Sequence, residues 1–397
     1  MSDVRLGIGF IPLVDSAPLI VAQEMGFAAE EGLSLDLIRA PSWSSLRDML
    51  SFGQVDAAHL LAPVPVATAL GLGGSATPLQ AISVLSVNGT VIGVNQALAA
   101  KLRANGHDFS FNDAAKAGEA LIGAVDGTLR IGVPFPFSMH AELLYYWLSS
   151  LGLPAPQSLN IRTVPPPLMA EAIKAGEIDA FCVGEPWGSI AVENGVGTLL
   201  LPGSAIWQFA PEKVLGVRAE WLQREGILGA RLVRAVWRAG RWLSDPSAHT
   251  LAAQILGKPA YLDLPAEIID RALSGRLTIS PQGEQRQVER FMEFHQGTAT
   301  FPWRSQAAWI GHQLASRTGL DRQEAMARVQ AVFRSDLYRQ ALRGLGADLP
   351  RHSSKLEGAL SEETMVAAES GHLWLSTNAF FDGAVFDPEQ GTKVFSE

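Results

Sequence analysis

The sequence predicts an α/β protein of two lobes that face each other across a ligand cleft, with a helical C-terminal region. A chain of 397 residues exceeds what one ordinary hydrophobic core holds, so two lobes are expected. The order β-α-β-α-β, which is the unit of a parallel sheet, occurs twice. Residues 179–187 form an apolar strand that breaks into Gly-Glu-Pro-Trp, and open α/β sheets bind small ligands at such strand ends.

The first β-α-β-α-β unit occupies the N-terminal part of the chain. Short apolar runs bounded by turn residues predict its strands. Apolar residues that recur every three to four positions predict its helices, and a serine cap opens the second of them. The expected strands are residues 5–10, 33–38 and 57–61, and the expected helices are residues 17–25 and 42–52.

The second unit repeats this plan, and residues 175–188 correspond to residues 52–65. Apolar segments at 81–94 and 214–217 are typical of crossings between two lobes. The expected strands are residues 130–134, 159–164 and 180–183, and the expected helices are residues 138–151 and 168–175. We therefore assign residues 1–92 to the first lobe, residues 93–216 to the second lobe, and residues 217–397 to a return into the first lobe and a helical C-terminal region.

Composition and charge argue against several classes of function. The net charge of −9 disfavours a nucleic-acid surface, which needs clustered Lys and Arg. No apolar run approaches the ~20 residues of a membrane span. The chain begins Met-Ser-Asp-Val-Arg and enters a strand without an export signal. With Met1 as the native start, we expect a cytoplasmic protein that contacts neither nucleic acid nor a membrane.

The chain shows none of the motifs that carry catalysis or metal binding. Residues 71–74 are rich in glycine but lack the preceding strand and the following Lys-Ser/Thr of a phosphate loop. The eight histidines are scattered without metal-ligand spacing, and no Gly-x-Ser-x-Gly nucleophile elbow occurs. We therefore expect a binding protein rather than an enzyme, with no metal and no cofactor.

Five residues are suited to line the cleft around an anion. Trp43 begins a helix and offers an aromatic wall, Thr90 follows Asn-Gly at the first crossing, and Gly184 offers a bare backbone N–H. His140 lies early in a helix, where N-terminal amides favour an anion. Lys213 places one cation beside the return crossing. Each residue alone has a commoner structural role, so the prediction rests on the combination, which requires no carboxylate.

Four motifs together resemble the nitrate- and bicarbonate-binding proteins of the NrtA/CmpA type. They are Gly-Phe-Ile-Pro-Leu-Val-Asp at 9–15, Ser-Trp-Ser-Ser-Leu-Arg-Asp at 42–48, Asp-Ala-Ala-His-Leu-Leu-Ala-Pro at 56–63 and Phe-Cys-Val-Gly-Glu-Pro-Trp at 181–187. The resemblance runs from residue 4 to at least residue 245. It implies a two-lobed periplasmic-binding-protein-like fold of type II, with the ligand between the lobes.

The resemblance also implies roles for the five residues. The family's ligand-contacting residues fall on Trp43, His140, Gly184 and Lys213. The family's glutamine falls on Thr90, a departure that shortens the reach of the donor. Nitrate accepts hydrogen bonds and cannot donate them, so it suits a lysine, whereas the bicarbonate-binding members carry an acidic residue at that position. The implied ligand is therefore nitrate, or nitrite as its smaller relative.

The expected cytoplasmic location makes the chain look like the nitrate/nitrite sensors of the NasS type. That resemblance implies a protein partner, an RNA-binding antiterminator of the NasT type, which is released when the anion binds and so switches on nitrate assimilation. A competing hypothesis is the nitrate substrate-binding protein of an ABC transporter. Two further hypotheses are a binding protein for another anion, such as a sulfonate, and an enzyme like those of thiamine-pyrimidine synthesis, which share the lobed fold.

Overall fold

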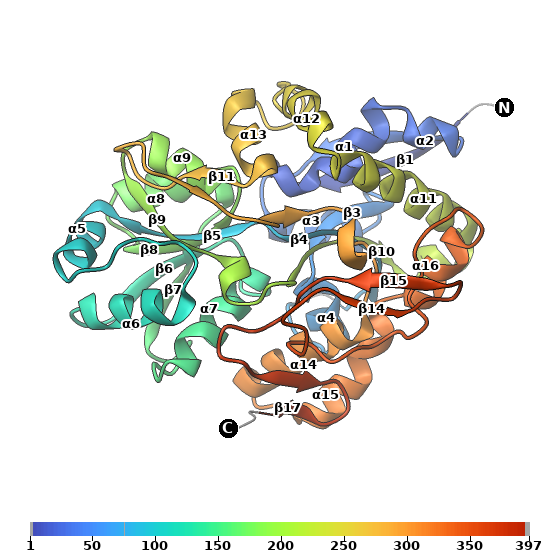
Figure 1. Ribbon diagram of the computed structural model, residues 1–397. Helices are drawn as coiled ribbons and strands as arrows, with labels where there is room; N and C mark the ends of the chain where they lie inside the picture. The colour runs from blue at the N-terminus through green and yellow to red at the C-terminus, as the bar shows by residue number, and fades with distance from the viewer. Residues whose placement is uncertain (1–2, 75, 394–397) are drawn as a thin grey trace.

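The first lobe is built on a six-stranded sheet with the order β13-β4-β10-β3-β1-β2 (Figure 1). The computed structural model describes residues 3–74 and 76–393, so residues 1, 2, 75 and 394–397 of the predicted lobes lie outside it. β1 pairs in parallel with β2 and β3, whereas β10 runs antiparallel to β3 and β4. The strands are β1 (Val4–Phe10), β2 (Leu33–Arg39), β3 (Ala57–Leu61), β4 (Leu79–Asn88), β10 (Pro211–Arg218) and β13 (Met292–Glu293).

The second lobe has a five-stranded sheet with the order β7-β6-β8-β5-β9, seen on the left of Figure 1. Its strands are β5 (Thr90–Asn95), β6 (Leu129–Val133), β7 (Leu159–Thr163), β8 (Ala180–Gly184) and β9 (Gly197–Pro202). Its helices are α5 (Gln96–Ala104), α6 (Ala114–Ala124), α7 (Met139–Ser150), α8 (Met169–Lys174) and α9 (Trp187–Glu193). β6 pairs in parallel with β7 and β8. The predicted two-lobed α/β class is confirmed.

The chain changes lobe where turn residues interrupt its strands. β4 and β5 are separated only by Gly89, whose φ is 92°. A Cβ at Gly89 would also lie 2.6 Å from Cε of Met292, so this sharp crossing requires glycine. The return crossing is residues 203–210, because β10 already pairs in the first sheet. Both crossings therefore precede the predicted boundaries at 92/93 and 216/217.

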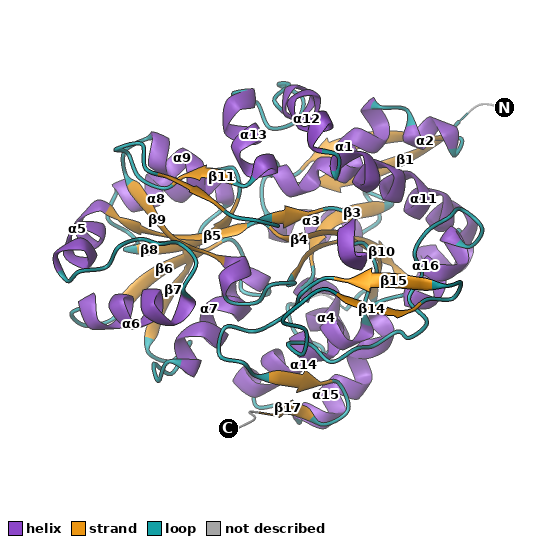
Figure 2. Cartoon of the chain, viewed as in Figure 1, coloured by secondary structure: helices purple, strands orange, loops and turns teal. Residues whose placement is uncertain are grey.

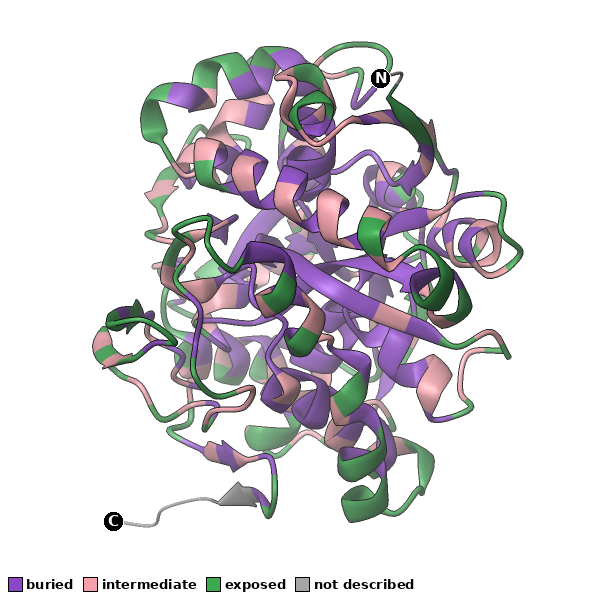
Figure 3. Cartoon of the chain, turned by 90° about the vertical axis from the view of Figure 1, so that its right-hand side faces the viewer, coloured by how far each residue is buried: buried purple, intermediate pink, exposed green. Residues whose placement is uncertain are grey.

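Helices cover both faces of the first sheet, and the strands lie buried behind them (Figures 2 and 3). α1 packs against α2, α11 and α12, while α16 and α11 contact β4. The helices of the first lobe that precede the C-terminal helices are α1 (Ala17–Glu24), α2 (Phe27–Glu30), α3 (Trp43–Ser51), α4 (Pro63–Ala69), α10 (Ala219–Arg224), α11 (Gly226–Leu243), α12 (His249–Leu256) and α13 (Ala266–Ser274). Among residues 3–74 and 76–393, no helix combines the length and the apolar character that a bilayer crossing needs.

The C-terminal region is mainly helical up to Leu342, as expected, apart from short strands at 276–278, 285–287 and 292–293, and it then continues as two short hairpins. Its helices are α14 (Arg304–Thr318), α15 (Arg322–Val329) and α16 (Ser335–Leu342), and its strands are β14 (Thr364–Ala367), β15 (His372–Leu375), β16 (Val385–Asp387) and β17 (Gly391–Lys393). The hairpins were not predicted from the sequence. Gly344, Gly346 and Pro350 stop the helical pattern before them.

The C-terminal region and a further hairpin bridge the two lobes. The hairpin β11 (Arg276–Thr278) and β12 (Gln285–Gln287) leads to the second sheet, where the amide of Leu199 donates to the carbonyl of Ile279 at 2.7 Å. The hydroxyl of Tyr146 on α7 donates to Asp382 of the tail at 2.9 Å. Arg317 on α14 lies 2.8 Å from the buried carboxylate of Glu142 on α7. These contacts hold the lobes in the arrangement that forms the site.

Candidate functional site

Lys213 is the centre of a buried polar cluster between the two lobes. It lies on β10, and its side chain is fully enclosed. Its Nζ is 2.7 Å from Oδ2 of Asp15 and donates to Oε1 of Glu212 at 2.8 Å. All three side chains have 0% exposure, so one ammonium group and two carboxylates share an environment without bulk water.

The first lobe adds His59 and Trp43 to this cluster. Asp15 lies in a short 3-10 helix, η1 (Val14–Ser16), directly after β1, and its Oδ1 is 3.0 Å from Nε2 of His59 on β3. The ring of Trp43 lies 5.5 Å from the His59 ring, and Nζ of Lys213 lies 5.6 Å from the Trp43 ring centroid. Ser42 caps α3 by accepting from the amide of Ser45, which fixes Trp43 as the first helical residue.

The second lobe contributes His140 and Gly184. Ser138 caps α7 and sets His140 in its first turn, where Nδ1 of His140 lies 3.2 Å from Oε1 of Glu212. Gly184 ends β8. A Cβ built on Gly184 would lie 3.1 Å from Cδ2 of Leu13, 3.5 Å from Oδ2 of Asp15 and 3.7 Å from Nε2 of His140, so glycine lets the backbone of β8 come close to all three groups. Residues from both lobes therefore surround one point.

Thr90 lies beside this cluster rather than within it. It begins β5 and is the cross-strand partner of Gly184. A Cβ built on Gly203 would lie 2.1 Å from Oγ1 of Thr90, so its hydroxyl packs against Gly203. The structure thus brings four predicted residues (Trp43, His140, Gly184 and Lys213) together and places Thr90 next to them on the second sheet.

Several buried polar atoms at the site have no hydrogen-bond partner among the described residues. They include Nε1 of Trp43, Oγ1 of Thr90 and Nε2 of His140. These side chains are at most 1% exposed. A buried donor without a partner costs about 1–3 kcal/mol, so native proteins seldom leave several of them together. An enclosed polar ligand would satisfy these groups.

The charges of the cluster hold its side chains in different protonation states. Burial raises the pKa of Asp15, but the charge of Lys213 and the hydrogen bond from His59 outweigh it, and the pKa falls to about 2. Burial lowers the pKa of Lys213, but Asp15 and Glu212 reverse this and raise it. Burial, partly offset by Lys213, raises the pKa of Glu212 to about 7. The cluster thus holds a firm ion pair and one carboxyl group that titrates near neutrality.

The two histidines are neutral near pH 7. Burial lowers the pKa of His59, although the contact with Asp15 opposes the effect. Burial and then the charge of Lys213 lower the pKa of His140 well below its usual range. Each neutral imidazole has one N–H and one bare nitrogen, so each can both donate and accept.

Sequence reasoning missed Asp15, His59 and Glu212, and the site it predicted without carboxylates was incomplete. Each missed residue carried a signal, because each is a polar residue inside an apolar stretch. His59 interrupts the apolar strand β3, and Glu212 directly precedes Lys213 on β10. Asp15 belongs to the motif at 9–15 that carries the family resemblance.

The lobes are closed over the site. The indole Nε1 of Trp187 on α9 donates to the carbonyl of Pro12 at 2.8 Å, and the amide of Val14 donates to the carbonyl of Glu185 at 2.9 Å. Lys213 is 0% exposed and His140 is 1% exposed. A ligand can therefore reach Lys213 only when the lobes part. Residues 3–74 and 76–393 contain no group of three or more His, Cys, Asp or Glu that could hold a metal ion.

Comparison with known proteins supports this reading of the fold. Residues 2–257 match the NMT1-like family. The chain is 30% identical over 404 residues to the nitrate/nitrite binding protein NrtA of Synechocystis sp., covering 96% of the chain and 82% of that protein. It is 34% identical over 353 residues to the nitrate import ATP-binding protein NrtC of Synechocystis sp., covering 87% of the chain but 51% of that protein. The chain thus spans about half the length of NrtC.

Solved structures give the same result. The crystal structure of the periplasmic nitrate-binding protein NrtA from Synechocystis PCC 6803 superposes with a TM-score of 0.83 at 28% identity, covering 98% of this chain and 96% of that chain. The aliphatic sulphonate binding protein SsuA from Escherichia coli has a TM-score of 0.55 at 16% identity, covering 85% of this chain and 99% of that chain, and shares the fold alone. The family match covers more than half of the chain, and the similarity to NrtA extends over 96% of the chain. This protein belongs to the NMT1-like family.

Proposed function

We propose that this protein binds nitrate or nitrite between its two lobes and acts as a binding protein rather than an enzyme. The observation that carries the proposal is the group of unpartnered donors (Trp43 Nε1, Thr90 Oγ1 and His140 Nε2) beside the buried Lys213. Nitrate and nitrite only accept hydrogen bonds and are small enough for an enclosed site. The similarity to proteins named for nitrate and nitrite binding supports this ligand class.

The cellular role that we propose first is that of a solute receptor for an ABC importer. The similarity to NrtA and NrtC supports this role, since NrtC is named as the ATP-binding protein of nitrate import. The expected partners are then the membrane components of the importer. Lobes that close around the anion give such components a surface that differs between the loaded and the empty receptor.

A second proposal is the cytoplasmic sensor that the sequence suggested. Its support is the complete closure over the site, because a partner that prefers open lobes is expelled when the anion closes them. The expected partner is an RNA-binding antiterminator of the NasT type. Mixing the two purified proteins with and without nitrate tests this role: a complex that dissociates with nitrate supports it, and no complex in either condition excludes it.

Calorimetric titration of the purified protein with nitrate, nitrite and bicarbonate tests the ligand. We expect binding of nitrate or nitrite, and loss of that binding in Lys213→Glu. The substitution would set a third carboxylate against Asp15 and Glu212 and cost about 2–5 kcal/mol in affinity. Lys213→Met, which removes the charge without adding one, is the milder variant if Lys213→Glu does not fold. Wild-type protein that binds neither nitrate nor nitrite would refute the proposal.

A further inference from the structure

The polar pair formed by His140 and Glu212 has a consequence for how an anion enters the site. Resting on the proposed function, we infer that the site takes up a proton together with each anion and holds it on the His140–Glu212 pair. Two independent features of the geometry lead to this inference. The first is the orientation of the imidazole, and the second is the balance of charge around Lys213.

The orientation of His140 leaves its two nitrogens with different neighbours. Nδ1 lies 3.2 Å from Oε1 of Glu212, while Nε2 lies near Gly184, and neither nitrogen has a hydrogen-bond partner among the described residues. A neutral imidazole has one proton. To donate to nitrate, which only accepts, Nε2 must hold that proton, and Nδ1 is then bare. A bare nitrogen repels the carboxylate oxygen of Glu212 unless another proton lies between them.

The balance of charge leads to the same conclusion. Among the described residues, Lys213 is the one Lys or Arg in contact with Asp15 and Glu212, and all three groups are fully buried. One ammonium group and two carboxylates carry a net charge of −1, and a bound monoanion makes it −2, in a place where water cannot screen the charges. One proton on the His140–Glu212 pair returns the net charge to −1. The anion and the proton are therefore expected to bind together, as protein plus anion plus proton.

The other titratable groups around Glu212 do not take up this proton, so we assign it to the His140–Glu212 pair. Asp15 on η1 and Lys213 on β10 form the ion pair described above. Burial raises the pKa of Asp15, but Lys213 and His59 lower it further, to about 2, so Asp15 does not take up the proton near neutral pH. Cys182 on β8 stays protonated, because burial and then the charge of Glu212 raise its pKa. The pKa of Glu212, raised by burial to about 7, allows an exchange of protons near neutral pH. Because Nδ1 of His140 and Oε1 of Glu212 lie only 3.2 Å apart, we assign the added proton to the pair and not to either group alone.

Calorimetry in buffers of different ionisation enthalpy measures this uptake directly. Nitrate is titrated into wild-type protein at about pH 8 in phosphate and in Tris, and the dependence of the observed enthalpy on the buffer gives the number of protons bound. We expect about one proton per anion at this pH. We also expect the association constant to fall by about tenfold per pH unit above about pH 7, where the free pair has lost its proton.

Two matched variants locate the proton. Glu212→Gln removes the carboxylate but keeps a hydrogen-bonding side chain, so we expect its nitrate affinity to be independent of pH and its proton uptake to vanish. Glu293→Gln is the control, because Glu293 on β13 is also a buried glutamate whose pKa is raised by burial, but its cation is Arg290 and not Lys213. This control should take up as many protons as the wild type.

The outcomes separate this inference from the function on which it rests. Nitrate binding by the wild type without proton uptake would overturn the inference alone, and so would full uptake in Glu212→Gln. Absence of binding of any anion would overturn the proposed function and the inference with it. The titration of the wild type decides the matter without a variant if thermal unfolding shows that Glu212→Gln does not fold.

Discussion

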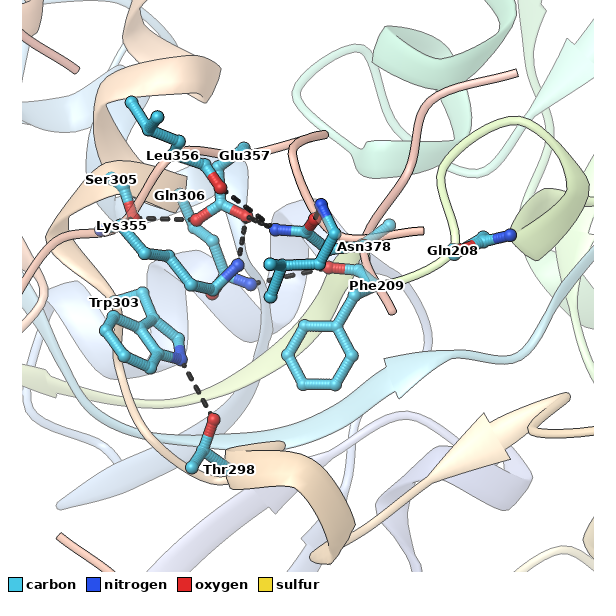
Figure 4. Close-up of polar contacts among 12 residues, drawn as sticks. Gln208, Phe209, Thr298, Trp303, Ser305, Gln306, Lys355, Leu356, Glu357 and Asn378 are labelled. Carbon is cyan, nitrogen blue, oxygen red and sulfur yellow. Dashed lines mark hydrogen bonds and ion pairs between the residues drawn. The ribbon is translucent and has the colours of Figure 1, made fainter. Parts of the chain in front are cut away.

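Lys213 between the lobes is fully buried and Lys355 in the C-terminal region is mostly buried, and each contacts a fully buried glutamate, but their surroundings differ in one respect. Figure 4 shows the cluster around Lys355. Its Nζ contacts Oε2 of Glu357, which also accepts from Nδ2 of Asn378 at 3.3 Å. The other oxygen, Oε1, accepts from the hydroxyl of Ser305 at 2.6 Å. Both oxygens of this carboxylate are therefore occupied.

Aromatic rings complete the enclosure of Lys355. Its Nζ lies 5.5 Å from the ring of Phe209 and 5.5 Å from the ring of Trp303. Burial lowers the pKa of Lys355, although Glu357 opposes the effect, whereas the two carboxylates around Lys213 raise the pKa of that lysine. The Lys355 cluster joins α14 to the tail, and in the described part of the chain none of the buried polar atoms of Ser305, Lys355, Glu357 and Asn378 lacks a hydrogen-bond partner. A buried lysine thus marks a binding site only where polar partners around it remain unsatisfied.

The comparison predicts that only one of the two lysines is needed for nitrate affinity. Lys355→Met leaves the carboxylate of Glu357 without its cation, and removing one partner of a buried pair costs about 3–5 kcal/mol. We expect the free energy of unfolding in urea to fall by this amount, while the nitrate affinity of the folded protein stays unchanged. Lys213→Met leaves Asp15 and Glu212 without their cation, so it should also lower the stability, but in addition it should abolish nitrate affinity. Equal losses of affinity in both variants would show that the comparison is wrong.

Glu185 is another buried carboxyl group, and it forms no ion pair with any of the described residues. Its Oε2 accepts from the amide of Ser189 at 3.1 Å, and Oε1 has no hydrogen-bond partner in the described part of the chain. Burial raises its pKa to about 7. The folded protein therefore keeps a proton on Glu185 that the unfolded chain releases above about pH 4.5. The contribution of Glu185 to the free energy of unfolding is complete below about pH 4.5 and is lost as the pH rises to about 7.

Glu185→Gln should remove this decline. At about pH 8 we expect the variant to be more stable than the wild type by about 1–3 kcal/mol, and at about pH 4.5 the gain should vanish. Urea unfolding of both proteins at the two pH values gives the difference between their free energies of unfolding. The other titrating groups are the same in both proteins, so their contributions cancel in this difference. A constant offset at both pH values would show that Glu185 does not titrate in this range.

The sequence predicted local structure well because local patterns determine it. The helix expected at 42–52 is observed as Trp43–Ser51 behind its Ser42 cap, and the strand expected at 57–61 is observed as Ala57–Leu61. The contact between Asp15 and Lys213 could not be predicted in this way. It joins residues far apart in the chain, and it forms only because β1 and β10 lie in one sheet under a closed second lobe.

Gly184 tests whether the space at the site is needed for a ligand. In Gly184→Ala the new methyl group would lie 3.1 Å from the flexible end of Leu13 and between Asp15 and His140. We expect little change in the unfolding temperature and a loss of about tenfold in nitrate affinity, since the methyl group occupies the space of the anion. Gly123→Ala in α6 is the control, because nothing lies within 4 Å of its added Cβ. Equal affinities for both variants would place the anion elsewhere.

The smallest expected effect belongs to a single hydrogen bond. Trp43→Phe removes the indole N–H, which has no partner among the described residues, and we expect nitrate affinity to fall about fivefold, the value of one hydrogen bond of about 1 kcal/mol. Trp207 supplies a matched control, because it is also fully buried with an unpartnered Nε1 but packs against Trp309 and Phe380. Trp207→Phe should cost similar stability and leave the affinity unchanged. A loss of affinity in both variants would mean that the smaller ring acts through general loosening of the core, and the indole of Trp43 would then not be a ligand contact.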